Sequence, residues 1–106
     1  MNWSGIGRKA IATRSLDVDE QPTYILRVFE PLQEGDGSVW VCAYEIERPG
    51  GFLRDEIRGG DSMQALLHAI GLLGVHALNS DENLAGRLSW SGQSAHFGFP
   101  PAEAIP

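Results

Sequence analysis

Hydrophobic residues recur at intervals of three and four positions between Asp61 and Asn79, and this spacing predicts one long amphipathic helix. Asp61 is a good N-cap because its carboxylate can accept a hydrogen bond from a free amide of the first turn. Gln64, three positions later, can reach back and complete a capping box. Asn79 is of a residue type that commonly ends helices. We expect a rod of about 27 Å, long enough to cross a small sheet.

This helix has two faces when its residues are placed at steps of about 100°. The face expected to point into the core carries Met63, Leu66, Leu67, Ile70, Leu73, Gly74, Ala77 and Leu78. The opposite face includes His68, Leu72, Val75 and His76, and no charged side chain lies on it. Since a helix without charge on both faces is usually covered on both sides, we expect these four residues to contact either the C-terminal segment or a second chain. A solvated outer face with single apolar residues is the remaining alternative.

Four shorter segments before the helix alternate between apolar and polar residues and are rich in β-branched and aromatic types, which predicts strands. These strands cover residues 8–18, 23–31, 39–48 and 52–58. Glycine-, proline- and aspartate-rich turns separate them. Short connections between consecutive strands predict an antiparallel meander. The expected fold is therefore α+β: a four-stranded antiparallel meander with the long helix packed on one face.

The C-terminal part contains two short aromatic pieces, residues 86–92 and 95–101. Trp90, Phe97 and Phe99 are large enough to cover the helix or to close one end of the sheet. We expect one domain over residues 1–106, with loose ends at residues 1–7 and 101–106 unless Trp3 docks onto the sheet.

The net charge of −6 at pH 7 argues against a nucleic-acid-binding protein, which needs a basic surface for phosphates. No apolar run is long enough to span a bilayer, so no membrane partner is expected. The single cysteine, Cys42, lies in an apolar strand and cannot form an internal disulfide, which predicts a buried, reduced thiol and a cytoplasmic protein.

Candidate catalytic chemistry is weak. His68 and His76 are eight residues apart on one helix, whereas two ligands of one metal need a spacing of three or four. His96 has no cysteine or carboxylate cluster near it in sequence. The segment around Ser62 lacks the second glycine of a nucleophile elbow, and Cys42 suits a core position. We therefore expect no catalytic residues, no metal and no cofactor.

The charges are distributed unevenly along the chain. Arg8, Lys9 and Arg14 are the only charged residues before Ser15. A possible acidic surface follows, made of Asp17, Asp19, Glu20, Glu34 and Asp36. The basic residues could pair the first strand with an acidic neighbour or simply decorate an edge.

Four segments of the chain, taken together in their order, resemble a family of small bacterial domains of unknown function. They are residues 40–46, 59–62, 86–90 and 98–100, and the resemblance extends from about Ala10 to Pro100. It implies a bacterial, cytoplasmic α+β domain and provides no catalytic or binding residues.

Two functional hypotheses follow. The first is a non-enzymatic protein-interaction module, either homodimeric or acting like an immunity protein or inhibitor that masks a basic partner with its acidic surface. The second is a small ligand-binding domain or enzyme with a pocket between the helix and the C-terminal aromatic residues, near His68, His76 and His96.

Overall fold

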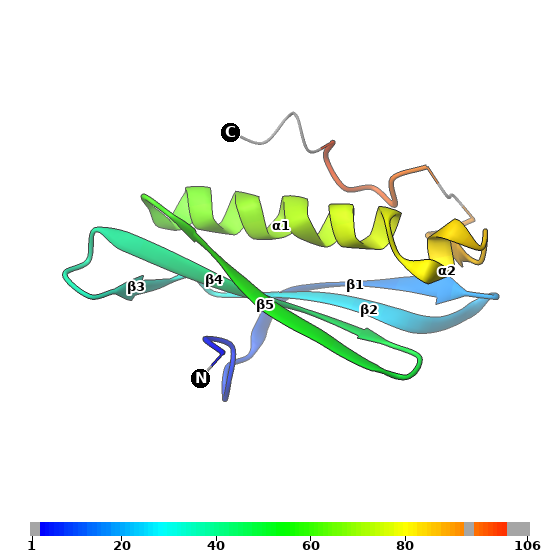
Figure 1. Ribbon diagram of the computed structural model, residues 1–106, viewed down its shortest axis with the longest axis horizontal. Helices are drawn as coiled ribbons and strands as arrows, with labels where there is room; N and C mark the ends of the chain where they lie inside the picture. Colours follow the sequence, from blue (N-terminus) through cyan, green and yellow to red (C-terminus); the bar gives the residue numbers. More distant parts are fainter. Residues whose placement is uncertain (1–2, 93–94, 102–106) are drawn as a thin grey trace.

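The computed structural model describes residues 3–92 and 95–101, which form one antiparallel sheet with a long helix on one face (Figure 1). Within these residues the strands are β1 (Ala10–Val18), β2 (Gln21–Phe29), β3 (Leu32–Glu34), β4 (Val39–Arg48), β5 (Gly51–Gly59) and β6 (Leu88–Ser89). The helices are α1 (Ser62–Leu78) and α2 (Asp81–Leu84). The predicted α+β class, antiparallel sheet and packed helix are confirmed.

The predicted number of four strands is wrong, because two short strands extend the sheet. The four long strands β1, β2, β4 and β5 do form an antiparallel meander. β2 and β3 pair with different halves of the same side of β4, and the break between them contains Pro31, which has no amide hydrogen to continue a ladder. β6 adds only two residues to the outer edge of β1, opposite Asp17 and Val18.

A two-residue turn joins β1 to β2. Val18 pairs with Gln21 across it, and both central residues, Asp19 and Glu20, have positive φ angles of 50° and 69°. This geometry matches the twist of a hairpin, but it favours asparagine and glycine over longer side chains. The turn is held from outside, because the Asp19 amide donates to the Arg87 carbonyl at 3.0 Å and the Asp19 carboxylate accepts from the Arg87 guanidinium at 2.6 Å.

The long helix α1 begins as predicted. The Asp61 carboxylate accepts a hydrogen bond from the Gln64 amide at 2.7 Å. The Gln64 side chain reaches back one residue further than a capping box requires, to the amide of Gly60. Asn79 is the C-cap.

The orientation of α1 differs from the prediction. Its fully buried stripe consists of Ala65, Ala69, Leu73 and Ala77, which are spaced four residues apart. Met63, Leu67 and Leu78 were expected in the core and are exposed, Met63 by 68%. Small side chains allow the helix to lie close to β4 and β5, so alanines rather than the largest apolar residues face the sheet.

The other half of the same sheet face, over β1 and β2, is covered by the described C-terminal residues 95–101. Phe97 and Phe99 are buried in the same core as Leu16, Leu26 and Tyr24. Phe99 packs directly on α1 at Gly74, where an added Cβ would lie only 2.8 Å from the Phe99 Cβ. Because Gly74 has no side chain, the aromatic ring can approach the helix backbone.

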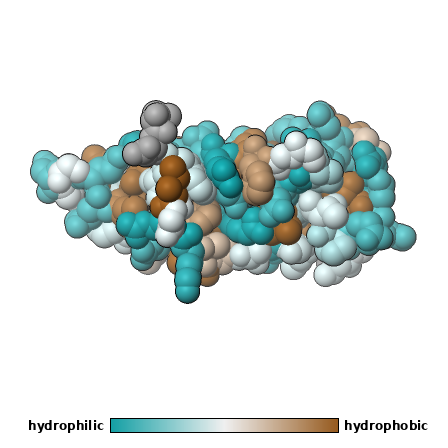
Figure 2. Space-filling model, turned by 90° about the horizontal axis from the view of Figure 1, so that it is seen from below, coloured by the Kyte–Doolittle hydropathy of each residue, from teal (hydrophilic) through white to brown (hydrophobic). Residues whose placement is uncertain are grey.

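The opposite face of the sheet carries a row of charged residues across three strands. Glu45 on β4 lies between Arg27 on β2 and Arg54 on β5, accepting hydrogen bonds at 2.9 and 2.7 Å. Only 6% of Glu45 is exposed. Figure 2 shows this face from below, where hydrophilic side chains predominate and separate hydrophobic ones lie between them.

The N-terminal residues that we expected to be loose dock on this face, as far as they are described. Trp3 lies edge-on to Phe29 with the ring centres 5.1 Å apart, and its indole nitrogen donates to the Asp55 carbonyl at 2.7 Å. The Ser4 amide donates to Glu56 at 2.9 Å. Residues 1–2 and 102–106, the rest of the two predicted loose ends, lie outside the described residues. None of the helices in the described ranges is long and apolar enough to cross a membrane.

Candidate functional site

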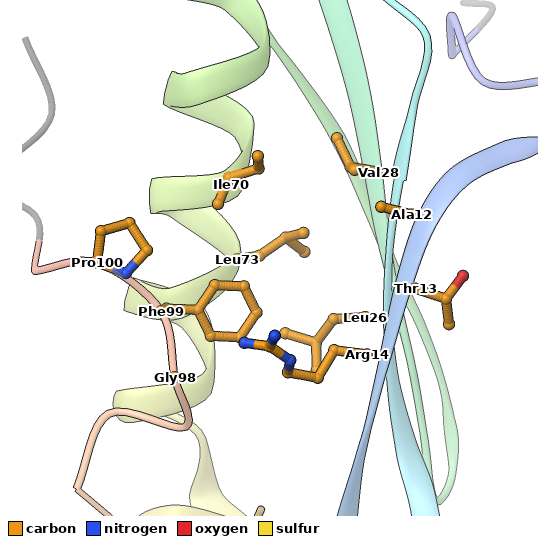
Figure 3. A pocket seen from close by; sticks show the side chains of 10 residues that line it. All are labelled: Ala12, Thr13, Arg14, Leu26, Val28, Ile70, Leu73, Gly98, Phe99 and Pro100. Carbon is orange, nitrogen blue, oxygen red and sulfur yellow. The ribbon is translucent and has the colours of Figure 1, made fainter.

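A half-open cavity of about 240 Å³ lies between α1, the first two strands and the C-terminal segment (Figure 3). It is lined by Ala12, Thr13, Arg14, Leu26, Val28, Ile70, Leu73, Gly98, Phe99 and Pro100. We call this cavity the Arg14 pocket.

The walls of the Arg14 pocket follow from the periodicity of its elements. Leu26 and Val28 on β2 are two residues apart and therefore point to the same face of the sheet. Ile70 and Leu73, three residues apart, share one side of α1. Phe99 closes the pocket, held in place by its contact with α1. The walls are thus mainly apolar and come from four separate parts of the chain.

Among the described residues that line the pocket, Arg14 alone has an ionisable side chain. One of its guanidinium nitrogens, Nη1, donates to the Phe97 carbonyl at 3.1 Å. The centre of the guanidinium lies 4.1 Å from the centre of the Trp90 ring and 5.2 Å from that of Phe99. The guanidinium is thus held beside the pocket by one neutral hydrogen-bond acceptor and by two aromatic rings.

Gly98 makes this packing possible. An added Cβ at Gly98 would lie 2.5 Å from the Trp90 ring and 2.8 Å from Arg14 Nη1, and its φ of 77° also favours glycine. Any side chain at this position would push the ring and the guanidinium apart.

The charge of Arg14 has no carboxylate partner within the described part of the chain. Six of the eight basic residues form ion pairs there: Arg8, Arg27, Arg48, Arg54, Arg58 and Arg87. The other two are Lys9 and Arg14. A partly buried guanidinium that is left without a counter-charge at an apolar pocket is suited to an anionic group.

A second cavity of about 200 Å³ lies at the C-terminal end of α1, with Tyr24, Arg48 and His76 among its lining residues. Its cation is neutralised, since the Arg48 guanidinium donates to both carboxylate oxygens of Glu82 at 3.0 and 2.6 Å. Burial raises the pKa of Tyr24, which lines the cavity, and raises that of Tyr44, which contacts the lining residue His76, to about 12. Both phenols therefore stay protonated at neutral pH, and this cavity offers a weaker case for ligand binding than the Arg14 pocket.

The four residues predicted on the outer face of α1 are half-buried rather than fully exposed. They are His68, Leu72, Val75 and His76. Leu72 packs against the core, and His76 Nε2 lies 3.4 Å from the Tyr44 hydroxyl on the sheet. This side of the helix is thus contacted in part from within the chain, and its role as an interaction surface stays a prediction.

The predicted acidic residues do not form one surface. Asp17, Asp19 and Glu20 belong to the β1–β2 hairpin, whereas Glu34 and Asp36 lie at the β3–β4 turn. These turns are at opposite ends of a molecule 45 Å long (Figure 1). Asp19 pairs with Arg87, whose hydrogen bond lowers the pKa of that carboxyl, and Glu34 pairs with Arg58. The alternation of strands separates residues that are close in sequence.

No metal site was predicted, and within residues 3–92 and 95–101 no three potential ligands cluster around a common point. The Cys42 thiol is buried, and desolvation raises its pKa to about 11, so it is a poor nucleophile at neutral pH. A pocket was expected between the helix and the C-terminal aromatics, near His68, His76 and His96, but none of these histidines is among the described residues that line the Arg14 pocket. The position of Arg14 beside a pocket was not predicted, although its place as the only charged residue of β1 before Asp17 was a usable signal.

One family of sequences matches residues 12–101, a range that contains the whole Arg14 pocket. The chain belongs to the DUF6968 family. This family is described as a domain of unknown function, so the expected resemblance to such a family is confirmed. No curated protein and no solved structure matches the chain.

Proposed function

We propose that this DUF6968 domain is a small binding protein that takes a molecule with an apolar body and one anionic group into the Arg14 pocket. The observation that carries the proposal is the guanidinium of Arg14, which lies beside an apolar cavity without a carboxylate partner among the described residues. The apolar walls would hold the body of the ligand, and Arg14 would hold its carboxylate or a similar group.

The size of the pocket limits the ligand class. A closed apolar cavity of about 150 Å³ accommodates benzene, and the Arg14 pocket has about 240 Å³ with an open side. An aromatic carboxylate or a medium-chain fatty acid therefore fits better than a large cofactor. The described lining residues offer no nucleophile or general base apart from the hydroxyl of Thr13, which favours binding over catalysis.

The interaction-module hypothesis receives less support from the same observations. It was based on an uncharged outer helix face and on one acidic surface. The outer face of α1 is contacted in part by the sheet of the same chain, and the acidic residues lie at opposite ends of the molecule. A bacterial origin and a cytoplasmic location remain part of the proposal, and the buried, unpaired thiol of Cys42 fits a reducing compartment.

The test is calorimetric titration of the full chain with phenylacetate and octanoate, alongside the corresponding neutral amides. We expect the acids to bind and to raise the melting temperature, and the amides to bind at least about tenfold more weakly, because a hydrogen bond to a charged group contributes about 1.5 to 3 kcal/mol. Arg14→Gln should abolish the difference between acid and amide, whereas Arg14→Lys should retain part of it.

Arg8→Gln is the matched control, since it removes the same charge from a residue that pairs with Glu30 outside the pocket. It should bind the acids like the unmodified protein. Equal affinity for acids and amides, or an equal loss in both glutamine variants, would contradict the proposal.

A further inference from the structure

The two outer edges of the sheet differ in their charges. β5 forms one edge, and four of its nine residues are charged: Arg54, Asp55, Glu56 and Arg58. Charged side chains of this kind discourage an edge from pairing with another strand. The other edge is β1, in which Arg14 is the only charged residue before Asp17.

Most of the β1 edge is open. β6 covers only Asp17 and Val18, so the first five residues of β1, from Ala10 to Arg14, have no strand on their outer side among the described residues. Ile11 within this stretch is 53% exposed. Between Lys9 and Arg14 the stretch carries no charged side chain and no proline, and its ladder with β2 has one register shift, between Ala10 and Ala12.

The open stretch is also the place where uncompensated positive charge gathers. Lys9 and Arg14, the two basic residues without an ion pair in the described part, lie at its two ends. No acidic residue occurs between Arg8 and Leu16. In a chain with a net charge of −6, this stretch is locally basic.

We propose that the open edge of β1 binds an extended, acidic segment of another protein, which adds a strand beside residues 10–14. Backbone hydrogen bonds would provide the affinity, and Lys9 and Arg14 would select acidic side chains. A second copy of this chain fits less well. Antiparallel pairing of two β1 edges would bring the same two cations of each copy together, between molecules that both carry a net charge of −6.

The edge and the Arg14 pocket are two different binding surfaces, although Ala12, Thr13 and Arg14 border both. Lys9 does not line the pocket. A Lys9 variant therefore distinguishes the two proposals, because it should weaken strand addition and leave the binding of small carboxylates unchanged.

The experiment is amide hydrogen exchange by NMR on the full chain, with a short blocked peptide that alternates valine and glutamate as the probe. Outward-facing amides within residues 10–14 should exchange rapidly in the free protein. They should slow by about tenfold when about nine-tenths of the protein is bound. A peptide in which prolines replace the valines keeps the charge but cannot form the ladder, so it should give no protection.

Lys9→Gln should lower the affinity for the glutamate peptide by about two- to fivefold, the range for an exposed ion pair. Met63→Glu is the control, because it changes the net charge by the same amount at an exposed position on α1. Met63→Glu should lower the affinity for the glutamate peptide only slightly, by the amount that the more negative net charge of the whole protein causes. Three kinds of result would overturn the proposal. The first is protection of amides outside residues 10–14. The second is equal binding of the proline peptide, or of a peptide with lysine in place of glutamate, and the third is protection that rises with protein concentration without any peptide.

Discussion

The two faces of the sheet are held by different interactions. The face below α1 and the C-terminal segment contains the continuous apolar core, in which Leu16, Tyr24, Leu26, Tyr44 and Ile46 are almost completely buried. The opposite face is organised around one buried carboxylate, Glu45, between two arginines, with a single tryptophan docked nearby. Truncating a buried apolar side chain leaves a cavity in the core. Charged groups near the surface that lose one partner can instead pair with another charged group or with water. We therefore expect unequal consequences from equivalent changes on the two faces.

The largest effect is expected on the apolar face. Ile46→Ala would remove most of a side chain that is 1% exposed, and it should lower the free energy of unfolding by about 2 to 5 kcal/mol because a cavity remains. Urea denaturation followed by circular dichroism measures this change. Ile11→Ala, at an exposed position, should cost less than about 1 kcal/mol. Similar losses in both variants would remove the distinction between core and surface.

The next largest effect is expected at the charged row. Glu45→Ala leaves Arg27 and Arg54 without their shared acceptor, although Arg27 keeps Glu47 at 2.9 Å and both guanidinium groups reach solvent. We expect a loss of about 1 to 2 kcal/mol in the same denaturation experiment. Glu30→Ala, which breaks the exposed pair with Arg8, should cost no more than about 0.5 kcal/mol. If Glu45→Ala costs as much as Ile46→Ala, the charged face is as important to stability as the core.

A smaller effect is expected from the N-terminal residues. Trp3→Ala removes an edge-on contact with Phe29 and a hydrogen bond to the Asp55 carbonyl, and it should cost about 1 kcal/mol. Trp3→Phe keeps an aromatic ring and loses the hydrogen bond, so its stability should lie between that of the unmodified protein and that of Trp3→Ala. Faster amide exchange in β5 near Asp55 should accompany the loss. An unchanged exchange pattern would indicate that Trp3 contributes little to this face.

The smallest effect at neutral pH concerns Cys42. Its pKa is raised to about 11 from an ordinary 9.0, so the unfolded chain releases this proton at a lower pH than the folded chain does. Stability should therefore be unaffected below about pH 9 and should fall as the pH rises from there toward 11. Cys42→Ala should flatten this part of the pH profile when each protein is compared with its own stability at pH 7. A profile that is identical in both proteins would show that the thiol is not responsible.

The fold was largely predictable because its signals are local. The alternation in residues 39–48 gave β4 with its observed ends, and Asp61 gave the start of α1. The rotation of α1 was not predictable from periodicity alone. A helix with apolar residues on every side has no unique buried face. In the structure the side with Ala65, Ala69 and Ala77 faces the sheet, because small side chains allow a closer approach to β4 and β5.

The candidate site was harder to predict than the fold. The pocket depends on Gly74 and Gly98 meeting Phe99, Trp90 and Arg14, and these contacts join residues far apart in the chain. The two short strands were missed because three and two residues are too few for an alternating pattern. The five predicted acidic residues are divided between two turns for a related reason: residues that are close in sequence lie far apart when a strand carries the chain from one end of the sheet to the other.

The turn at Asp19 and Glu20 has a consequence for synthesis in the cell. Two non-glycine residues with positive φ make a poor nucleus for a hairpin, and the group that holds them, Arg87, is 68 residues away from Asp19. A ribosome delivers both strands of the β1–β2 hairpin long before it delivers Arg87. We therefore expect the first hairpin of the nascent chain to stay incompletely formed until residue 87 has emerged from the ribosome, so that a residue translated much later completes this turn.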